Sequence, residues 1–127
     1  MNLTRIGGAL LAIALPFMVT GVAHASDDTS LTLSVSVPEG ETQEVVLECD
    51  PPGGTHPKAM FACVELLRSD GDFDALADHQ FPMSCTLEYR PVVAAATGTW
   101  HGEPVEWTRE YSNPCMLSSE TGAVFRF

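Results

Sequence analysis

The sequence predicts an α+β fold, in which a five-stranded antiparallel sheet carries two short helices packed on one face. Strand-like patterns occupy five runs, at 31–37, 45–49, 92–97, 105–111 and 123–127. Helix-forming segments lie between the second and third of these runs. Four cysteines, an even number, indicate two disulfides.

The first 25 residues are predicted to be a signal peptide. Arg5 precedes the apolar run Ile6–Val22, and Ala23-His24-Ala25 has the A-x-A pattern of a cleavage site. Pro16 interrupts the run, which argues against a membrane anchor. We therefore expect a secreted, extracellular protein whose mature form has no membrane attachment, with one domain over residues 26–127.

The mature chain is small and strongly acidic. Removing 25 of the 127 residues leaves 102, enough for a single core. All 17 acidic residues remain with five of the six basic ones, because Arg5 is lost, so the net charge is −12. This charge argues against binding nucleic acid, whose affinity comes from neutralised phosphates.

The first two strands are expected to form a hairpin. Leu31–Val37 alternates apolar and polar residues without fault, which predicts one apolar face. Val45, Leu47 and Cys49 share one side of the next run. Pro38-Glu39-Gly40 is the turn between them.

A loop at Asp50–Thr55 is expected to lead into the first helix. Pro57 suits its first turn, with Thr55 or His56 near the cap, and Asp70-Gly71 ends it. Two apolar faces are possible at helical spacing: Phe61, Val64 and Leu67, or Cys63, Leu66 and Leu67.

A second short helix is predicted at Asp72–Ala77, with Asp72 as N-cap. The apolar strand Val92–Thr97 should be covered on both faces, or partly by a subunit contact, and Gly98-Thr99 can turn the chain. The next strand should carry Val105, Trp107, Arg109 and Tyr111 on one side and end at Ser112–Cys115. A final strand is expected at Ala123–Phe127.

Enzyme chemistry finds little support in this chain, so we expect no enzyme, no cofactor and no metal. No G-x-S-x-G motif is present, and cysteines used in bridges leave no thiol nucleophile. Neither a C-x-x-C nor an H-x-x-x-H pair exists to bind zinc. His56 is interpreted as a turn or cap residue with one side-chain hydrogen bond, while His79 and His101 are assigned no role.

The segment Met83–Pro91 admits two interpretations. It is either a half-buried strand entry with a structural disulfide, or an extended, cross-linked segment that offers Leu87 to the specificity pocket of a protease. Cys85 lies only two residues before Leu87, so a bridge there would hold the segment close to that side chain. Three pairings of the four cysteines are possible, of which Cys49–Cys63 with Cys85–Cys115 is the most local.

The order and spacing of several short motifs resemble the Streptomyces subtilisin inhibitor family of secreted serine-protease inhibitors. The resemblance covers about 31–127 and rests on the following motifs: Gly54-Thr55-His56-Pro57, Cys63 in a helix-like segment, Cys85-x-x-x-Tyr89-x-Pro91-Val92, Trp100-x-Gly102, Ser112-Asn113-x-Cys115 and Val124-Phe125-x-Phe127.

The resemblance implies a reactive loop at Ser84–Pro91. In that family the residue two after the loop cysteine is P1, the side chain that fills the protease pocket, so P1 is Leu87 and the reactive bond is Leu87–Glu88. The other loop residues are Ser84, Cys85, Thr86, Tyr89, Arg90 and Pro91, and the Asn113 amide would support the loop carbonyls.

The resemblance also implies the pairing Cys49–Cys63 with Cys85–Cys115, and a homodimer through the sheet. An apolar P1 suits subtilisin-like and chymotrypsin-like proteases. Three positions depart from the family pattern: Thr86 replaces the common proline at P2, Ser84 replaces a larger apolar residue at P4, and Glu88 puts an acid at P1′. The alternatives are a secreted disulfide-bonded binding or structural module, or a cross-linking substrate of another secreted enzyme, with no protease target.

Overall fold

The computed structural model describes residues 13–18, 21 and 28–127. The predicted cleavage site at 23–25 lies outside these residues. Residues 13–18 belong to no helix or strand, and within the described ranges no helix is both long and apolar enough to span a bilayer.

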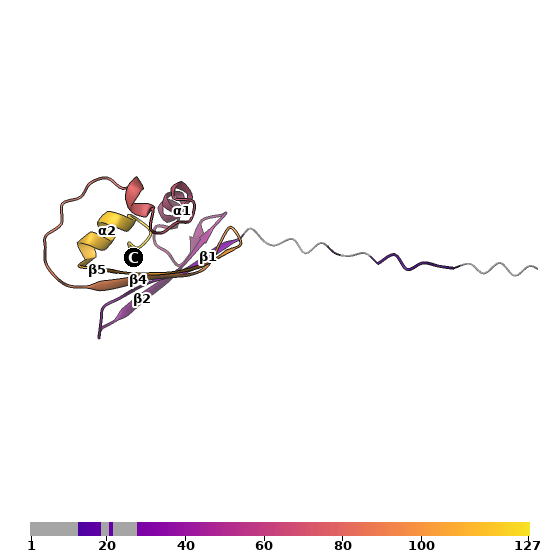
Figure 1. The fold of residues 1–127 in the computed structure, drawn as a ribbon, viewed down its shortest axis with the longest axis horizontal. Helices are drawn as coiled ribbons and strands as arrows, with labels where there is room; N and C mark the ends of the chain where they lie inside the picture. The colour runs from indigo at the N-terminus through magenta and orange to yellow at the C-terminus, as the bar shows by residue number, and fades with distance from the viewer. Residues whose placement is uncertain (1–12, 19–20, 22–27) are drawn as a thin grey trace, which may run out of the picture.

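The fold is a two-layer arrangement with the helices on one face of an antiparallel sheet (Figure 1). The sheet has the strand order β3-β2-β1-β4-β5, which confirms the predicted fold class. The strands are β1 (Thr29–Ser36), β2 (Thr42–Cys49), β3 (Gly53–Gly54), β4 (Val92–Trp100) and β5 (Glu103–Tyr111). β3 lies in the predicted loop and supplies the fifth strand.

The predicted β1–β2 hairpin forms, and β1 is the central strand of the sheet. Leu31 pairs with Leu47 and Leu33 with Val45, so both apolar faces point to the same side. The turn at 38–40 is closed by the Gly40 N–H, which donates to the Val37 carbonyl at 2.9 Å. β1 pairs on its other edge with β4, where Leu33 lies opposite Ala96.

The β4–β5 connection differs from the prediction. β4 continues through Gly98-Thr99 to Trp100, and the turn is made by His101 and Gly102, with φ of 46° and 80°. Two consecutive residues with positive φ are typical of the tight two-residue hairpin turn that matches strand twist.

The strand Val92–Thr97 is covered on one face only within this chain. Val92, Ala94 and Ala96 are buried under the helices, whereas Val93 and Ala95 are half-buried on the opposite face of the sheet. The first of the two expectations, coverage on both faces, is therefore wrong for the isolated chain.

Helix α1 (Ala59–Arg68) buries Ala62, Cys63 and Leu66 against the sheet. The buried face is closest to the second predicted one, because it contains Cys63 and Leu66. Leu67 is exposed, as are Phe61 and Val64 of the first predicted face. The helix begins at Ala59 with Lys58 as N-cap, two residues later than predicted from Pro57. Cys63 is bridged to Cys49 at the end of β2, as the resemblance implied.

Gly71 ends the first helical segment and makes room for Trp100. Its N–H donates to the Leu66 carbonyl at 2.8 Å and its φ is 73°. A Cβ at this position would lie 2.3 Å from Trp100 Cδ1, so the indole requires glycine here.

The second predicted helix is misplaced. Asp72 accepts a hydrogen bond from the Asp74 N–H at 2.9 Å, but the segment that follows is a short 3₁₀ turn, η1 (Leu76–His79), not a helix at 72–77. The second α-helix is instead α2 (Pro114–Thr121), which begins where a strand closure was expected.

The predicted last strand, Ala123–Phe127, is not a strand. After α2 the chain makes successive turns, in which the Val124 N–H donates to the Thr121 carbonyl and the Arg126 N–H to the Ala123 carbonyl, both at 3.2 Å. Phe125 is buried beside Phe73 and Trp107, so aromatic packing, not strand pairing, holds this segment.

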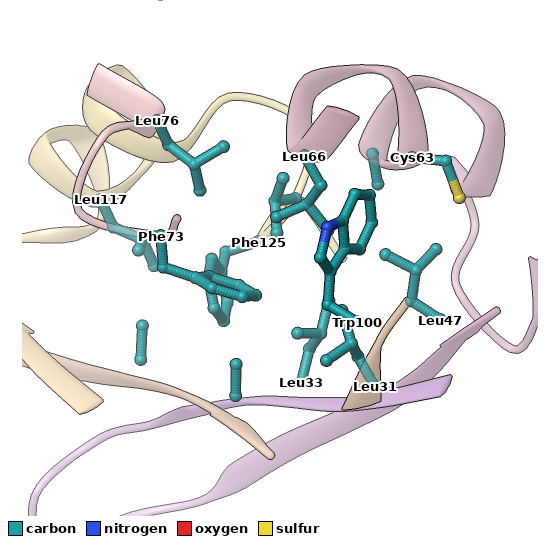
Figure 2. Packing of buried hydrophobic residues seen from close by; sticks show 14 of the residues in the cluster. Leu31, Leu33, Leu47, Cys63, Leu66, Phe73, Leu76, Trp100, Leu117 and Phe125 are labelled. Carbon is teal, nitrogen blue, oxygen red and sulfur yellow. The ribbon is translucent and has the colours of Figure 1, made fainter. Parts of the chain in front are cut away.

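The core fills the space between the sheet and the helices (Figure 2). Leu31, Leu33 and Leu47 rise from the sheet and meet Leu66 and Trp100. Leu76, Leu117, Phe73 and Phe125 close the other end, beneath η1 and α2. This packing fixes the position of α2, from which the candidate site is built.

Candidate functional site

The segment at 80–91, between η1 and β4, contains no helix or strand and arches away from the body of the domain (Figure 1). Most of its side chains are exposed, and Leu87 has a relative accessibility of 101%. A single exposed apolar side chain would need no explanation, but Phe81, Met83 and Tyr89 on the same segment are exposed as well, and gathered apolar side chains are typical of interaction sites. The loop is therefore the first candidate for a binding site.

The Cys85–Cys115 bridge ties the loop to α2. The two Cα atoms lie 5.7 Å apart, and the bridge spans 30 residues of sequence. Cys115 belongs to the first turn of α2, whose position is fixed by the buried Leu117. The bridge therefore anchors the loop two residues before Leu87.

Asn113 holds the loop on both sides of Leu87. Its Nδ2 donates to the Thr86 carbonyl at 3.1 Å and to the Glu88 carbonyl at 2.8 Å. Its Oδ1 accepts from the Met116 N–H at 2.8 Å, so the same side chain is the N-cap of α2. With only 3% of its surface exposed, this amide forms a fixed link between helix and loop.

The far side of the loop is tied to the domain through its backbone. The Arg90 N–H donates to the Ser112 carbonyl at 2.9 Å, and Pro91 then leads into β4. Proline restricts its own φ and keeps Arg90 extended. Beyond Glu88, the backbone thus has little freedom although its side chains are exposed.

The loop side chains include one ion pair that the sequence reasoning missed. Arg90 Nε lies 3.1 Å from Glu88 Oε1. Opposite charges two residues apart in an extended segment project to one side, and this spacing was the available signal.

The predicted loop residues are gathered in one place. Ser84, Thr86, Glu88, Tyr89 and Arg90 are exposed, and Cys85 and Pro91 are half-buried. Asn113 and Cys115 approach the loop from α2, as expected from their spacing.

His79 ends η1 directly before this loop, whereas His56 and His101 make contacts elsewhere in the domain. His56 is buried, and its Nε2 donates to the Val124 carbonyl while its Nδ1 accepts from the Lys58 N–H, both at 2.9 Å. It therefore makes two side-chain hydrogen bonds and not the one predicted. His101 stacks on Trp100 at the far end of β4. Over the described ranges, no three His, Cys, Asp or Glu side chains are grouped so as to bind a metal.

The comparison with known families concerns the domain as a whole. The family model described as subtilisin inhibitor-like matches residues 27–113. The chain belongs to this family. Its curated relatives are protease inhibitors and not enzymes, in agreement with the expectation from the motifs.

Two curated relatives illustrate the similarity. The chain is 43% identical to the protease inhibitor SIL-V1/SIL-V4 of Streptomyces netropsis, over 75% of this chain and 94% of that protein. It is 37% identical to a subtilase-type protease inhibitor of Streptomyces fradiae, over 96% of this chain and 94% of the relative.

A solved structure extends the likeness to a complex. Streptomyces caespitosus sermetstatin, crystallised with Bacillus licheniformis subtilisin, superposes with a TM-score of 0.67 at 28% identity. The match covers 79% of this chain and 99% of the other.

Proposed function

We propose that this protein is a secreted inhibitor of subtilisin-like serine proteases, with Leu87 as P1 and Leu87–Glu88 as the reactive bond. One observation carries the proposal: Leu87 is fully exposed, whereas the carbonyls on either side of it are held by one buried amide. The subtilisin complex of the sermetstatin relative supports the choice of target class.

Rigidity is the source of affinity in this mechanism. A protease binds its substrate as an extended strand with P1 in a pocket. A free peptide loses about 1–2 kcal/mol of backbone entropy per ordered residue, and each immobilised side chain adds roughly 0.5–1.5 kcal/mol. The Cys85–Cys115 bridge and Asn113 order this loop before the protease arrives, so most of that loss is avoided.

The same anchors slow the release of cleaved product. If the Leu87–Glu88 bond is cut, the Leu87 end stays attached through the Cys85–Cys115 bridge and the Glu88 end through β4. Asn113 continues to hold the carbonyls of Thr86 and Glu88. The new amine therefore stays beside the acyl-enzyme, and re-formation of the bond competes with hydrolysis.

The loop side chains set the range of targets. Leu87 suits the apolar pockets of subtilisin-like and chymotrypsin-like enzymes and lacks the charge that a trypsin pocket selects. Thr86 leaves P2 less rigid than proline would. Ser84 at P4 offers little apolar surface, so replacing it with Met should strengthen subtilisin binding.

Secretion and oligomeric state complete the proposal. We place the signal peptide at 1–25 and the inhibitor domain at 26–127. The open face of the sheet, with Val93 and Ala95 half-buried, is the surface through which two copies would form a homodimer. Sedimentation at micromolar concentration tests this, because Val93→Glu should shift the dimer to a single-chain species.

Titration of subtilisin tests the function. Residual activity should fall linearly to zero near one inhibitor chain per enzyme. Leu87→Lys should lose most subtilisin inhibition and gain trypsin inhibition, because a charged end would have to enter an apolar pocket. Leu67→Lys is the matched control, since Leu67 is also exposed but lies on α1.

The alternatives give different results in the same titration. A binding or structural module leaves subtilisin activity unchanged. A cross-linking substrate of another secreted enzyme gives no stoichiometric loss of activity, and if subtilisin degrades it, activity recovers. Equal behaviour of Leu87→Lys and Leu67→Lys towards both proteases would show that Leu87 is not P1.

A further inference from the structure

The loop presents an acid next to its reactive bond and a cation two residues beyond it. Glu88 occupies P1′ and Arg90 occupies P3′ in the proposed alignment, and their side chains are joined at 3.1 Å. In this free state both are well exposed, at 66% for Arg90 and 57% for Glu88. Such a pair contributes little to the stability of the fold.

The pair is preformed because both backbone positions are fixed. The Glu88 carbonyl accepts from Asn113 Nδ2 at 2.8 Å, and the Arg90 N–H donates to the Ser112 carbonyl at 2.9 Å. The two side chains thus meet without a rearrangement of the loop. Basic residues are scarce in this chain, with six Lys and Arg against 17 Asp and Glu, and Arg90 is the one basic residue at 80–91.

The electrostatic situation changes when a protease covers the reactive bond. The P1′ carboxylate then loses water, and a buried carboxylate without a partner is strongly unfavourable. It also lies beside the site where a serine protease stabilises negative charge on its oxyanion, so a lone carboxylate would oppose that charge. A guanidinium carried by the loop itself offsets both effects.

We propose that Arg90 is a specificity-determining residue that allows this loop to present an acid at P1′. The inference rests on the proposed function and adds a role to a residue three positions beyond P1. Arg90 acts through Glu88, so its contribution should vanish when Glu88 is uncharged. The loop would then tolerate a P1′ acid for which the target protease provides no cation.

A double-mutant cycle with subtilisin tests this role. The proteins are wild type, Arg90→Gln, Glu88→Gln and the double variant, and the inhibition constant is measured for each. We expect Arg90→Gln to weaken inhibition roughly tenfold in the wild-type background, mainly through faster dissociation. In the Glu88→Gln background the same change should have less than a twofold effect.

A conservative variant and a stability control complete the design. Arg90→Lys keeps the charge and should retain most of the affinity lost in Arg90→Gln. The thermal midpoints of all variants should agree, because the free pair is exposed.

The outcomes separate this inference from the function on which it rests. Equal losses from Arg90→Gln in both backgrounds would show that Arg90 contacts the protease directly, and no loss in either would show that it is not engaged. Either result overturns the inference while the wild type still inhibits. A wild type that fails to inhibit subtilisin overturns the proposed function, and this inference with it.

Discussion

The buried amide of Asn113 offers the sharpest test of how the loop is held. Asn113→Ser removes both hydrogen bonds to the Thr86 and Glu88 carbonyls, because a serine side chain is too short to reach them. Serine is also a favourable N-cap, so its hydroxyl oxygen can accept the hydrogen bond from the Met116 N–H in place of the amide oxygen. The substitution therefore separates loop support from helix capping.

The expected magnitude follows from the two bonds that are lost. A neutral hydrogen bond contributes about 0.5–1.5 kcal/mol net, so the two bonds together stabilise the ordered conformation of the loop by roughly 1–3 kcal/mol. Converted to binding, this predicts an inhibition constant weaker by about 5- to 150-fold. The loop should also be hydrolysed faster, since the carbonyls flanking Leu87 are no longer held.

Progress curves with subtilisin measure both effects. Ser119→Ala is the control, because it removes a bond to the Met116 carbonyl inside α2 and leaves the loop untouched. If Asn113→Ser inhibits as tightly as the wild type and resists hydrolysis equally, the amide does not brace the loop and the reasoning fails.

Three further predictions concern the bridges, the core and alkaline stability. Replacing Cys85–Cys115 by serines should weaken inhibition more than replacing Cys49–Cys63, when both variants are compared at a temperature at which they are folded; equal losses would contradict a loop-specific role. His56→Ala should lower the unfolding free energy by about 2–4 kcal/mol in urea titrations, because it leaves the Val124 carbonyl and a backbone N–H unpaired, and a change below about 1 kcal/mol would speak against this. Burial raises the pKa of Tyr111 above its usual value of 10.0, so the folded state holds this proton more tightly than the unfolded state. The stability that the protonated Tyr111 hydroxyl contributes is fully present below its pKa in the unfolded state and is lost as pH rises through its pKa in the folded state. The thermal midpoint of Tyr111→Phe should therefore fall less steeply than that of the wild type above about pH 10. An unchanged slope would contradict this assignment.

Four of the five strands, β1, β2, β4 and β5, could be predicted because their pattern is local. Leu31, Leu33 and Val35 alternate with polar residues, and this period allows only one face to be buried. The predicted face of β5 also holds, since Trp107 packs on Phe73 and Tyr111 is buried.

The C-terminal region could not be predicted by the same reasoning. Phe125 and Phe127 alternate as in a strand, but their rings pack on the core from a chain of turns, which only the tertiary structure determines. Helix α2 was missed because Asn113-Pro114 reads as a turn, although asparagine at N-cap followed by proline at N1 is also a helix start. Two weak helix formers, Ser118 and Ser119, then conceal its length.

Some features of the candidate site could be predicted from the sequence and others could not. The motif order that marks a family assigns P1 to Leu87, which is exposed, but the assignment itself stays a prediction. The spacing of Asn113 from Cys115 predicted that the Asn113 amide approaches the loop, and it does. The Glu88–Arg90 pair was not foreseen, because side-chain partners in an irregular segment depend on backbone geometry that neither propensity nor periodicity specifies.

The most direct test of the account is to identify the bond that subtilisin attacks. The protein is incubated with a trace of enzyme until intact and cleaved forms reach equilibrium, and the mixture is then analysed by mass spectrometry before and after reduction. The account predicts one cleavage, between Leu87 and Glu88, with the two fragments held together by Cys85–Cys115 until the bridge is reduced. Cleavage at another bond of the loop, or complete degradation without an equilibrium mixture, would contradict the assignment of Leu87 as P1.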